Sequence, residues 1–445
     1  MTTAVTRPAP TLSPLLGPGL LLAITIVALE SVAMSTVAPE IARDLRGLSL
    51  YGWVSSAFML ACLTGAVLTG LVADRRGLAG SAGLALGLLG AGLMLVGFAP
   101  GMEVLIAGRV LEGLGVGGLN ALPFAVIGRA YQGPAQARML GAVAFAWMIP
   151  GLVGPWLAAQ LAEVWTWRAV MWSLGALLAV AAPLCVLPLR SLPAGAGDRG
   201  GKRLLIYAVT LPVATGLLLE GLRRADLLSV PLVLLGVLGT AWAARPLFPP
   251  GILSLRPGLS AALGLRAAMA WAMMGTSPFL TLALQQLHGL NATQAGLILT
   301  VGGISWTLGA NLQAWIERQY GEDTRRSRVA WAAVVLSGGV LLTLGGLTGP
   351  LPLWTVFAGW FIAGVGMGVG YNSNSLYAMS TAPQGQGGAL SGQLANVEVL
   401  AVAAAAGLGG ALIAQVQPTE QALTLILLLN LGVSLVPWLA VRRLR

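Results

Sequence analysis

Three glutamates stand deep inside long apolar stretches of this sequence, where an ionisable side chain needs either a partner or a function. They are Glu30, Glu112 and Glu398. An ionisable group near the centre of a bilayer costs about 2.5–3.5 kcal/mol on insertion scales. A carboxyl group in such a place can hold and release a proton, because burial disfavours its charged form. We predict that Glu30 and Glu398 carry protons; the alternative for each is a structural hydrogen bond or ion pair.

Arg109 precedes Glu112 by three positions, so the two side chains share one face of a helix. One interpretation is that they neutralise each other, as buried charges usually require. Glu398 has no charged neighbour in its own stretch, so its partner has to come from elsewhere. The candidates are Arg109 and a transported proton.

Other chemistries find little support in the sequence. The chain has two cysteines, Cys62 and Cys185, both in apolar stretches, and a single histidine, His288. A disulfide framework or a His/Cys metal site is therefore not expected. There is no Gly-x-x-x-x-Gly-Lys-Ser/Thr loop for ATP and no cluster of a nucleophile with a base. We expect no catalytic residue, metal or cofactor, and an energy source in an ion gradient, with protons preferred and sodium left open.

The composition places nearly all of the chain in lipid. Hydrophobic residues make up 57% of the 445 residues and charged residues 9%, with a mean hydropathy of +0.84. The net charge of +10 comes from basic residues scattered between apolar stretches, without the contiguous basic face that nucleic acid requires. The sequence thus predicts an all-α polytopic membrane protein whose main partner is the bilayer.

Apolar stretches of about 20 residues indicate membrane helices. Fourteen are predicted, at 15–38, 51–73, 78–99, 102–128, 138–161, 167–189, 204–221, 227–244, 259–287, 293–316, 329–347, 353–378, 388–416 and 421–441. This pattern predicts a six-helix bundle at 1–190, a linker with two inserted membrane helices at 191–257, and a second six-helix bundle at 258–445.

The loops differ in their content of Lys and Arg. One side of the predicted membrane carries most of these residues, and the other carries only Arg43, Arg46, Arg168, Arg223 and Arg224. Because positive loops stay in the cytoplasm, we expect a multi-pass protein of the inner membrane with both termini cytoplasmic.

A weak internal repeat relates the two predicted bundles. Four glycines of the fourth predicted helix recur in the twelfth, with Gly108, Gly113, Gly115 and Gly117 matching Gly359, Gly364, Gly366 and Gly368. Small residues at this spacing allow helices to approach closely in a membrane. Arg109 and Glu112 become Trp360 and Ala363 in the second copy, so helix packing alone does not require the charged pair.

Several motifs resemble those of the major facilitator superfamily. Gly70-x-x-x-Asp74-Arg75-x-Gly77 resembles its signature loop, and Arg109-x-x-x-Gly113-x-Gly115 resembles its second motif. The segment 150–155, which contains Gly154 and Pro155, is similar to the motif associated with antiporters. The stretch 28–41 and the segment 165–168 resemble the fourteen-helix drug:proton antiporters, in which an acid stands at the position of Glu30.

The resemblance implies a major facilitator fold, alternating access and proton-coupled export. It further implies that Arg109 faces a central cavity and orients the proton-accepting acid, so the proton-coupling set is Glu30, Arg109, Glu112 and Glu398. A conformational gate is expected from the signature loop, the antiporter motif and a looser second copy of the loop. Its residues are Gly70, Asp74, Arg75, Gly77, Gly154, Pro155, Glu317 and Arg318.

Few charges but many large apolar side chains stand within the predicted helices, which favours a hydrophobic or amphipathic small-molecule substrate. The expected substrate-binding residues are Trp53, Trp147, Trp271, Met274, Asn120, Asn372 and Asn396. For any single tryptophan the alternative is a lipid-facing or interfacial position. We expect a monomeric multidrug-type exporter. A lipid exporter of the same fold and a proton-coupled importer of a small solute remain open, with a membrane sensor or enzyme less favoured.

Overall fold

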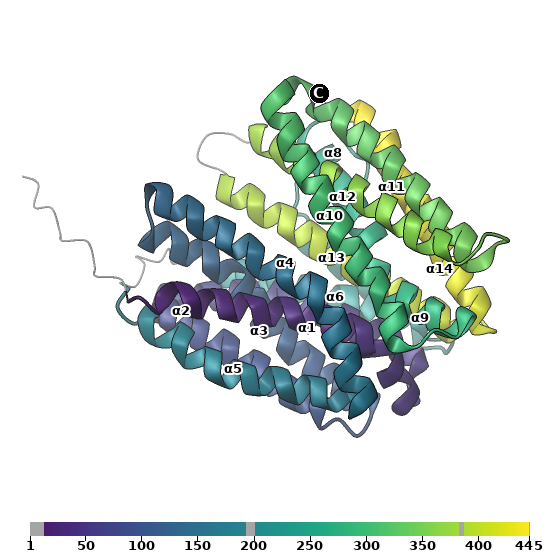
Figure 1. The fold of residues 1–445 in the computed structure, drawn as a ribbon, viewed down its shortest axis with the longest axis horizontal. Coiled ribbons are helices and arrows are strands. Elements are labelled where there is room, and N and C mark those ends of the chain that lie inside the picture. Colours follow the sequence, from purple (N-terminus) through teal and green to yellow (C-terminus); the bar gives the residue numbers. More distant parts are fainter. Residues whose placement is uncertain (1–12, 193–200, 382–386, 445) are drawn as a thin grey trace, which may run out of the picture.

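The computed structural model describes residues 13–192, 201–381 and 387–444, and all of its regular elements are helices (Figure 1). Residues 193–200, in the expected linker, lie outside the described residues. The α-helices are α1 (Leu16–Asp44), α2 (Tyr51–Gly97), α3 (Met102–Ala130), α4 (Gly133–Val164), α5 (Trp167–Leu189), α6 (Gly201–Arg223), α7 (Ser229–Ala244), α8 (Leu259–Ala270), α9 (Ser277–His288), α10 (Ala292–Tyr320), α11 (Arg325–Thr348), α12 (Trp354–Ser380), α13 (Gly387–Gln415) and α14 (Thr419–Ala440).

The prediction of fourteen membrane helices is wrong. Twelve helices among the described residues are long and apolar enough to cross a membrane. The expected helices 51–73 and 78–99 are the two arms of a single element, α2, which are joined at the non-helical Gly77, and the expected helix 227–244 forms α7, which has only 16 residues. Hydropathy marks each apolar stretch, but it reports neither how two stretches are joined nor how many residues of a stretch are helical.

Helix α2 changes direction at Gly77. This glycine has φ 75° and ψ 176°, a backbone conformation that side chains with a Cβ rarely adopt. Beyond it, the Ser81 hydroxyl donates a hydrogen bond to the Thr69 carbonyl over 2.8 Å. A straight helix would hold these two residues roughly 18 Å apart. The two arms of α2 therefore lie side by side, with Gly77 at the bend.

A second irregularity lies between α8 and α9. Residues Trp271–Gly275 form a π-helical turn between them, so the expected helix 259–287 is present but contains one wider turn. Such turns are frequent at functional sites. Nothing in the apolar pattern of the sequence indicates this turn.

The repeated glycines of α3 and α12 sit at helix crossings. A Cβ on Gly113 would come within 2.2 Å of the Phe58 carbonyl oxygen, and one on Gly115 within 2.5 Å of the Ala85 carbonyl oxygen. Helix α3 therefore packs against both arms of α2. In the second copy, Gly364 faces Ser305 of α10 and Gly366 faces Leu336 of α11 in the same way. The repeat seen in the sequence is thus a repeat of helix packing.

The two ends of the bundle can be named by their loops. The arginine-poor end contains the connections 45–50, 98–101, 165–166, 224–228, 289–291, 349–353 and 416–418, and the opposite end is the arginine-rich end. In the arginine-poor half, hydrogen bonds join the group of helices α1–α5 to the group α8–α14. The Tyr51 hydroxyl donates to the Pro278 carbonyl over 2.7 Å, and the Thr293 hydroxyl donates to Glu163 over 2.9 Å.

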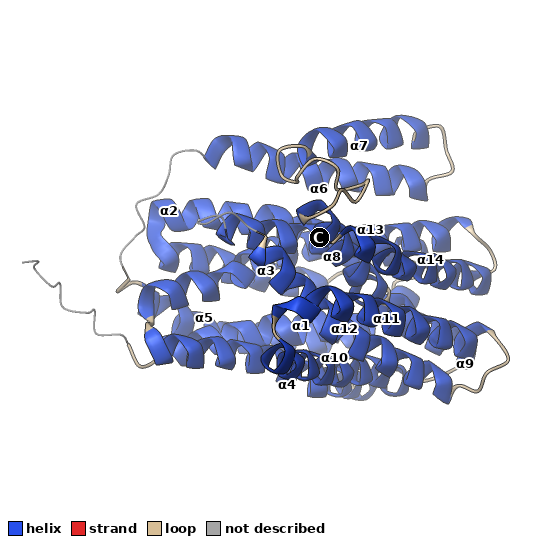
Figure 2. Cartoon of the chain, turned by 90° about the horizontal axis from the view of Figure 1, so that it is seen from above, coloured by secondary structure: helices blue, strands red, loops and turns tan. Residues whose placement is uncertain are grey.

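Helices α6 and α7 form a hairpin along one side of the bundle (Figure 2). Helix α6 packs against α2 and α13, whereas only Gly236 and Ala243 are buried on α7. The inserted hairpin therefore has an inner helix that touches the bundle and an outer helix that is largely exposed.

Candidate functional site

A buried ion cluster joins α1 and α3. Arg109 donates through Nη1 to carboxylate oxygens of both Glu30 and Glu112. The side chain of Arg109 is 3% exposed, and those of both glutamates are 0% exposed. Glu30 lies on α1, and the i, i+3 spacing on α3 places Arg109 beside Glu112. The pairing of Arg109 with Glu112 suggested by their spacing is present, and Glu30 joins it; the role of the three residues in proton coupling stays a prediction.

Two further contacts hold the Arg109 guanidinium in place. Its Nε donates to the Val54 carbonyl over 3.0 Å, and its Cζ lies 4.1 Å from the centre of the Phe58 ring. Both residues belong to the first arm of α2. An aromatic face attracts a desolvated cation, so Arg109 is bound from three helical segments at once.

The cluster contains two carboxylates for one guanidinium. With both glutamates ionised it carries one uncompensated negative charge, and the low-dielectric surroundings make such a charge costly. The Oε1 atom of Glu112 is buried and has no hydrogen-bond partner among the described residues. One bound proton on either glutamate would balance the charge of the cluster.

A second ion cluster surrounds Glu398 on α13. Its Oε2 accepts from Arg266 Nε over 3.0 Å and from the Tyr371 hydroxyl over 2.6 Å. Arg266 Nη1 also donates to the Ser375 hydroxyl over 2.7 Å, and its guanidinium lies 3.2 Å from the centre of the Tyr371 ring. Helices α8, α12 and α13 therefore meet at this cluster, which holds one carboxylate and one guanidinium.

The predicted partner of Glu398 is corrected by this geometry. The partner is Arg266 rather than Arg109. Arg266 is buried, with 8% of the residue exposed. Sequence distance hid the pair, because 132 residues separate its members. Tyr371 and Phe58 were also missed, since a lone aromatic residue in an apolar stretch carries no signal of a cation beside it.

The gate residues fall into three groups. Asp74 and Arg75 are exposed just before the bend at Gly77, and Gly70 is exposed as well. Gly154 lies against α1, where a Cβ would be 3.5 Å from Leu29 and Val32, and Pro155 lies beside Gly296 of α10. The antiporter-like segment is therefore at the contact between α4, α1 and α10.

The second copy of the signature loop is more strongly paired than the first. Glu317 accepts hydrogen bonds from Arg325 and Arg328, each over 2.5 Å, while Arg318 is exposed. Gly321 has φ 66° and so resembles Gly77 in its backbone. The first copy has Leu78 and Ala79 after its glycine. The second copy is instead followed by Arg325 and Arg328 at the start of α11, and these two arginines bind Glu317.

The expected substrate-binding residues do not form one cluster. Trp53 lies near the arginine-poor end, where its indole N–H donates to Glu220 over 3.1 Å. Three asparagines lie in the arginine-rich halves of their helices, with Asn120 exposed and Asn372 and Asn396 half-buried. Nearer the middle of the bundle, Trp147 is 42% exposed on α4, while Trp271 and Met274 are half-buried in the π-helical turn. Their binding role stays a prediction, and the position of Trp53 favours a contact with α6.

No group of three or more His, Cys, Asp or Glu side chains suited to a metal ion occurs within residues 13–192, 201–381 and 387–444. The polar clusters described above consist instead of carboxylates with arginines.

Comparison with known proteins agrees with this architecture. The sequence profile described as Major Facilitator Superfamily matches residues 20–406. A probable multidrug-efflux transporter of Mycobacterium tuberculosis is 25% identical over 423 residues, which cover 90% of this chain and 88% of the relative. A probable triacylglyceride transporter of Mycobacterium leprae is 25% identical over 412 residues, which cover 82% and 77%.

Solved structures show the same fold. The crystal structure of the POT family transporter PepTSo superposes with a TM-score of 0.70 at 13% identity and covers 97% of each chain. Similarity at this level of identity concerns the fold alone. The profile match over residues 20–406 shows that this chain belongs to the Major Facilitator Superfamily and is a multi-pass membrane transporter of small molecules, not an enzyme.

Proposed function

We propose that this transporter exports hydrophobic or amphipathic compounds in exchange for protons. The observation that carries the proposal is the buried cluster of Glu30, Arg109 and Glu112, in which two carboxylates share one guanidinium. A proton that enters the cluster removes its excess charge, and a proton that leaves restores it. A cycle of this kind can favour one conformation over another, because a buried charge is stabilised only where its surroundings compensate it.

In this proposal the segments 1–190 and 258–445 act as two bundles that rock about a site between them. If the arginine-rich end faces the cytoplasm, as the charge of the loops favours, both termini are cytoplasmic and the hydrogen-bonded arginine-poor end is closed to the outside. Protonation from outside and release of substrate would then require the contacts of Tyr51 and Thr293 to separate. We further propose a monomer in the inner membrane.

The relatives support export of hydrophobic compounds, since one is named a probable multidrug-efflux transporter. A second candidate function is lipid export, favoured by the relative named a probable triacylglyceride transporter. Both functions use apolar substrates, and only measured transport distinguishes them.

The test is substrate-driven proton movement in liposomes with a panel of lipophilic cations and of lipids. We expect Glu30→Gln and Glu112→Gln to retain substrate binding and to lose coupled proton flux. Glu103→Gln is the control, because this glutamate is exposed at the start of α3, outside both ion clusters. Glu398→Gln tests the second cluster. Coupling that persists in all three cluster variants would refute proton exchange at these acids.

A further inference from the structure

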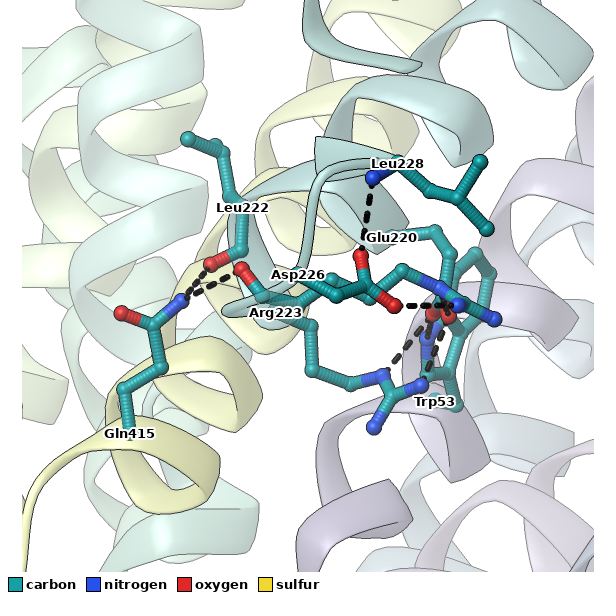
Figure 3. Close-up of polar contacts among 8 residues, drawn as sticks. Trp53, Glu220, Leu222, Arg223, Asp226, Leu228 and Gln415 are labelled. Atoms are coloured by element: carbon teal, nitrogen blue, oxygen red, sulfur yellow. Dashed lines mark hydrogen bonds and ion pairs between the residues drawn. The ribbon is translucent and has the colours of Figure 1, made fainter. Parts of the chain in front are cut away.

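The inner helix of the inserted hairpin is attached to both parts of the bundle (Figure 3). Toward α2, the carboxylate of Glu220 accepts the indole N–H of Trp53 over 3.1 Å. Toward α13, the amide of Gln415 donates to the Leu222 carbonyl and, over 3.3 Å, to the Arg224 carbonyl. These two attachments lie within one turn of α6, at the arginine-poor end.

Neighbouring polar groups hold both attachment points in position. Arg223 and Arg224 donate to Glu220 over 2.6–2.8 Å, which orients its carboxylate. The last carbonyls of a helix lack partners within that helix, and Gln415 supplies donors to those at the end of α6. Asp226 accepts the Leu228 N–H over 3.1 Å and thereby holds the following turn.

Apolar contacts follow the same path. Leu219 of α6, Leu60 of α2 and Ala403 of α13 form one buried cluster. A Cβ on Gly407 would come within 2.4 Å of the Leu219 side chain, so α6 lies tightly on α13. Beneath α6, Gly52 and Gly410 bring α2 and α13 into direct backbone contact. Helix α6 therefore covers the line along which α2 and α13 meet.

We propose that the α6–α7 hairpin is a brace that stabilises the conformation in which α2 and α13 touch at the arginine-poor end. The proposal rests on the alternating access described above. When the ends of α2 and α13 separate, α6 can follow only one of them, so either the Trp53 contact or the Gln415 contact has to break.

The experiment measures the separation of the two ends directly. Spin labels are placed on Glu103→Cys and Thr348→Cys, which are exposed on α3 and α11 at the arginine-poor end. The background carries Cys62→Ala and Cys185→Ala, which replace the two buried free cysteines. Distance distributions are recorded by pulsed electron spin resonance in lipid nanodiscs, without substrate. This readout is independent of proton flux.

Two conservative variants remove one attachment each. Trp53→Phe keeps an aromatic ring without the N–H donor, and Gln415→Met keeps the chain length without the amide. We expect each to raise the ratio of separated to closed ends by about two- to tenfold, the range for one net hydrogen bond. The double variant should shift the ratio no further than either single variant, because α6 keeps one attachment when the ends separate and the loss of either attachment already removes the link between them.

A matched control removes a hydrogen bond inside the hairpin. Thr240→Val breaks the 3.3 Å contact between the Thr240 and Thr215 hydroxyls, which joins α7 to α6 only, and we expect an unchanged distribution. Gly407→Ala provides an independent route, because its methyl group displaces Leu219 without altering a polar contact, and it should shift the distribution in the same direction.

Unchanged distances in Trp53→Phe, Gln415→Met and Gly407→Ala would overturn the brace, as would an equal shift in Thr240→Val. Proton-coupled export that persists alongside such a result would leave the proposed function intact. Conversely, a shift in distance without any coupled flux would support the brace and refute the proposed function.

Discussion

Replacement of Arg109 by glutamine tests the charge balance of the α1–α3 cluster. The guanidinium is the cation that both Glu30 and Glu112 contact, and all three side chains are at most 3% exposed. Solvent screening, which makes surface ion pairs worth about 0–1 kcal/mol, therefore does not apply here. Breaking a buried pair by removing one partner costs about 3–5 kcal/mol. We expect Arg109→Gln to lower the free energy of unfolding by about 3 kcal/mol or more. Uptake of protons by the two carboxyls, which removes their charge, sets the upper limit of this loss.

A triple variant separates the effect of charge from that of packing. Glu30→Gln, Arg109→Gln and Glu112→Gln together remove every charge from the cluster, so no carboxylate is left uncompensated. Replacing a complete buried ion pair is often close to neutral, and we expect the triple variant to recover more than about 2 kcal/mol of the loss. Arg75→Gln is the control, since Arg75 is exposed; such surface changes lie within about 0.5 kcal/mol.

The assay is unfolding in mixed micelles by titration with sodium dodecyl sulfate, followed by tryptophan fluorescence and circular dichroism. Two results would refute the reasoning. One is an Arg109→Gln variant as stable as the parent. The other is a triple variant no more stable than Arg109→Gln, which would assign the loss to the Phe58 and Val54 contacts instead of the charges.

Three further predictions use the same unfolding assay. Gly115→Ala should lower the free energy of unfolding by about 1–3 kcal/mol, because its Cβ would approach a backbone carbonyl at 2.5 Å. The control Gly87→Ala has open space and should cost less than about 0.5 kcal/mol. Equal losses in the two variants would contradict the close packing of α3. Gly77→Ala should cost about 1–3 kcal/mol from the strained φ of 75°, and a gain in stability would show that the bend does not need that conformation. Tyr371→Phe should cost about 1.5–3 kcal/mol, since its hydroxyl donates to Glu398 over 2.6 Å; no loss would mean that the Arg266 contact satisfies the carboxylate alone.

The sequence alone determined the class of the protein and part of its site. Long apolar stretches need helices that satisfy their own backbone in lipid, so a polytopic all-α protein followed directly from composition. The motifs around Gly77 and Arg109 identified the family that the profile match then showed. The pairing of Arg109 with Glu112 was also readable, because residues three apart on a helix share a face.

Only the tertiary structure decided how distant segments meet. It showed that Arg266 pairs with Glu398, that Glu30 shares the guanidinium of Arg109, and that Trp53 is bound by Glu220. It also corrected the helix count, since the joining of the two arms of α2 at Gly77 and the short length of α7 depend on backbone geometry that hydropathy does not report. The physical reason is common to all of these cases: composition fixes how a segment interacts with lipid, whereas a partner many residues away is chosen by how the helices pack.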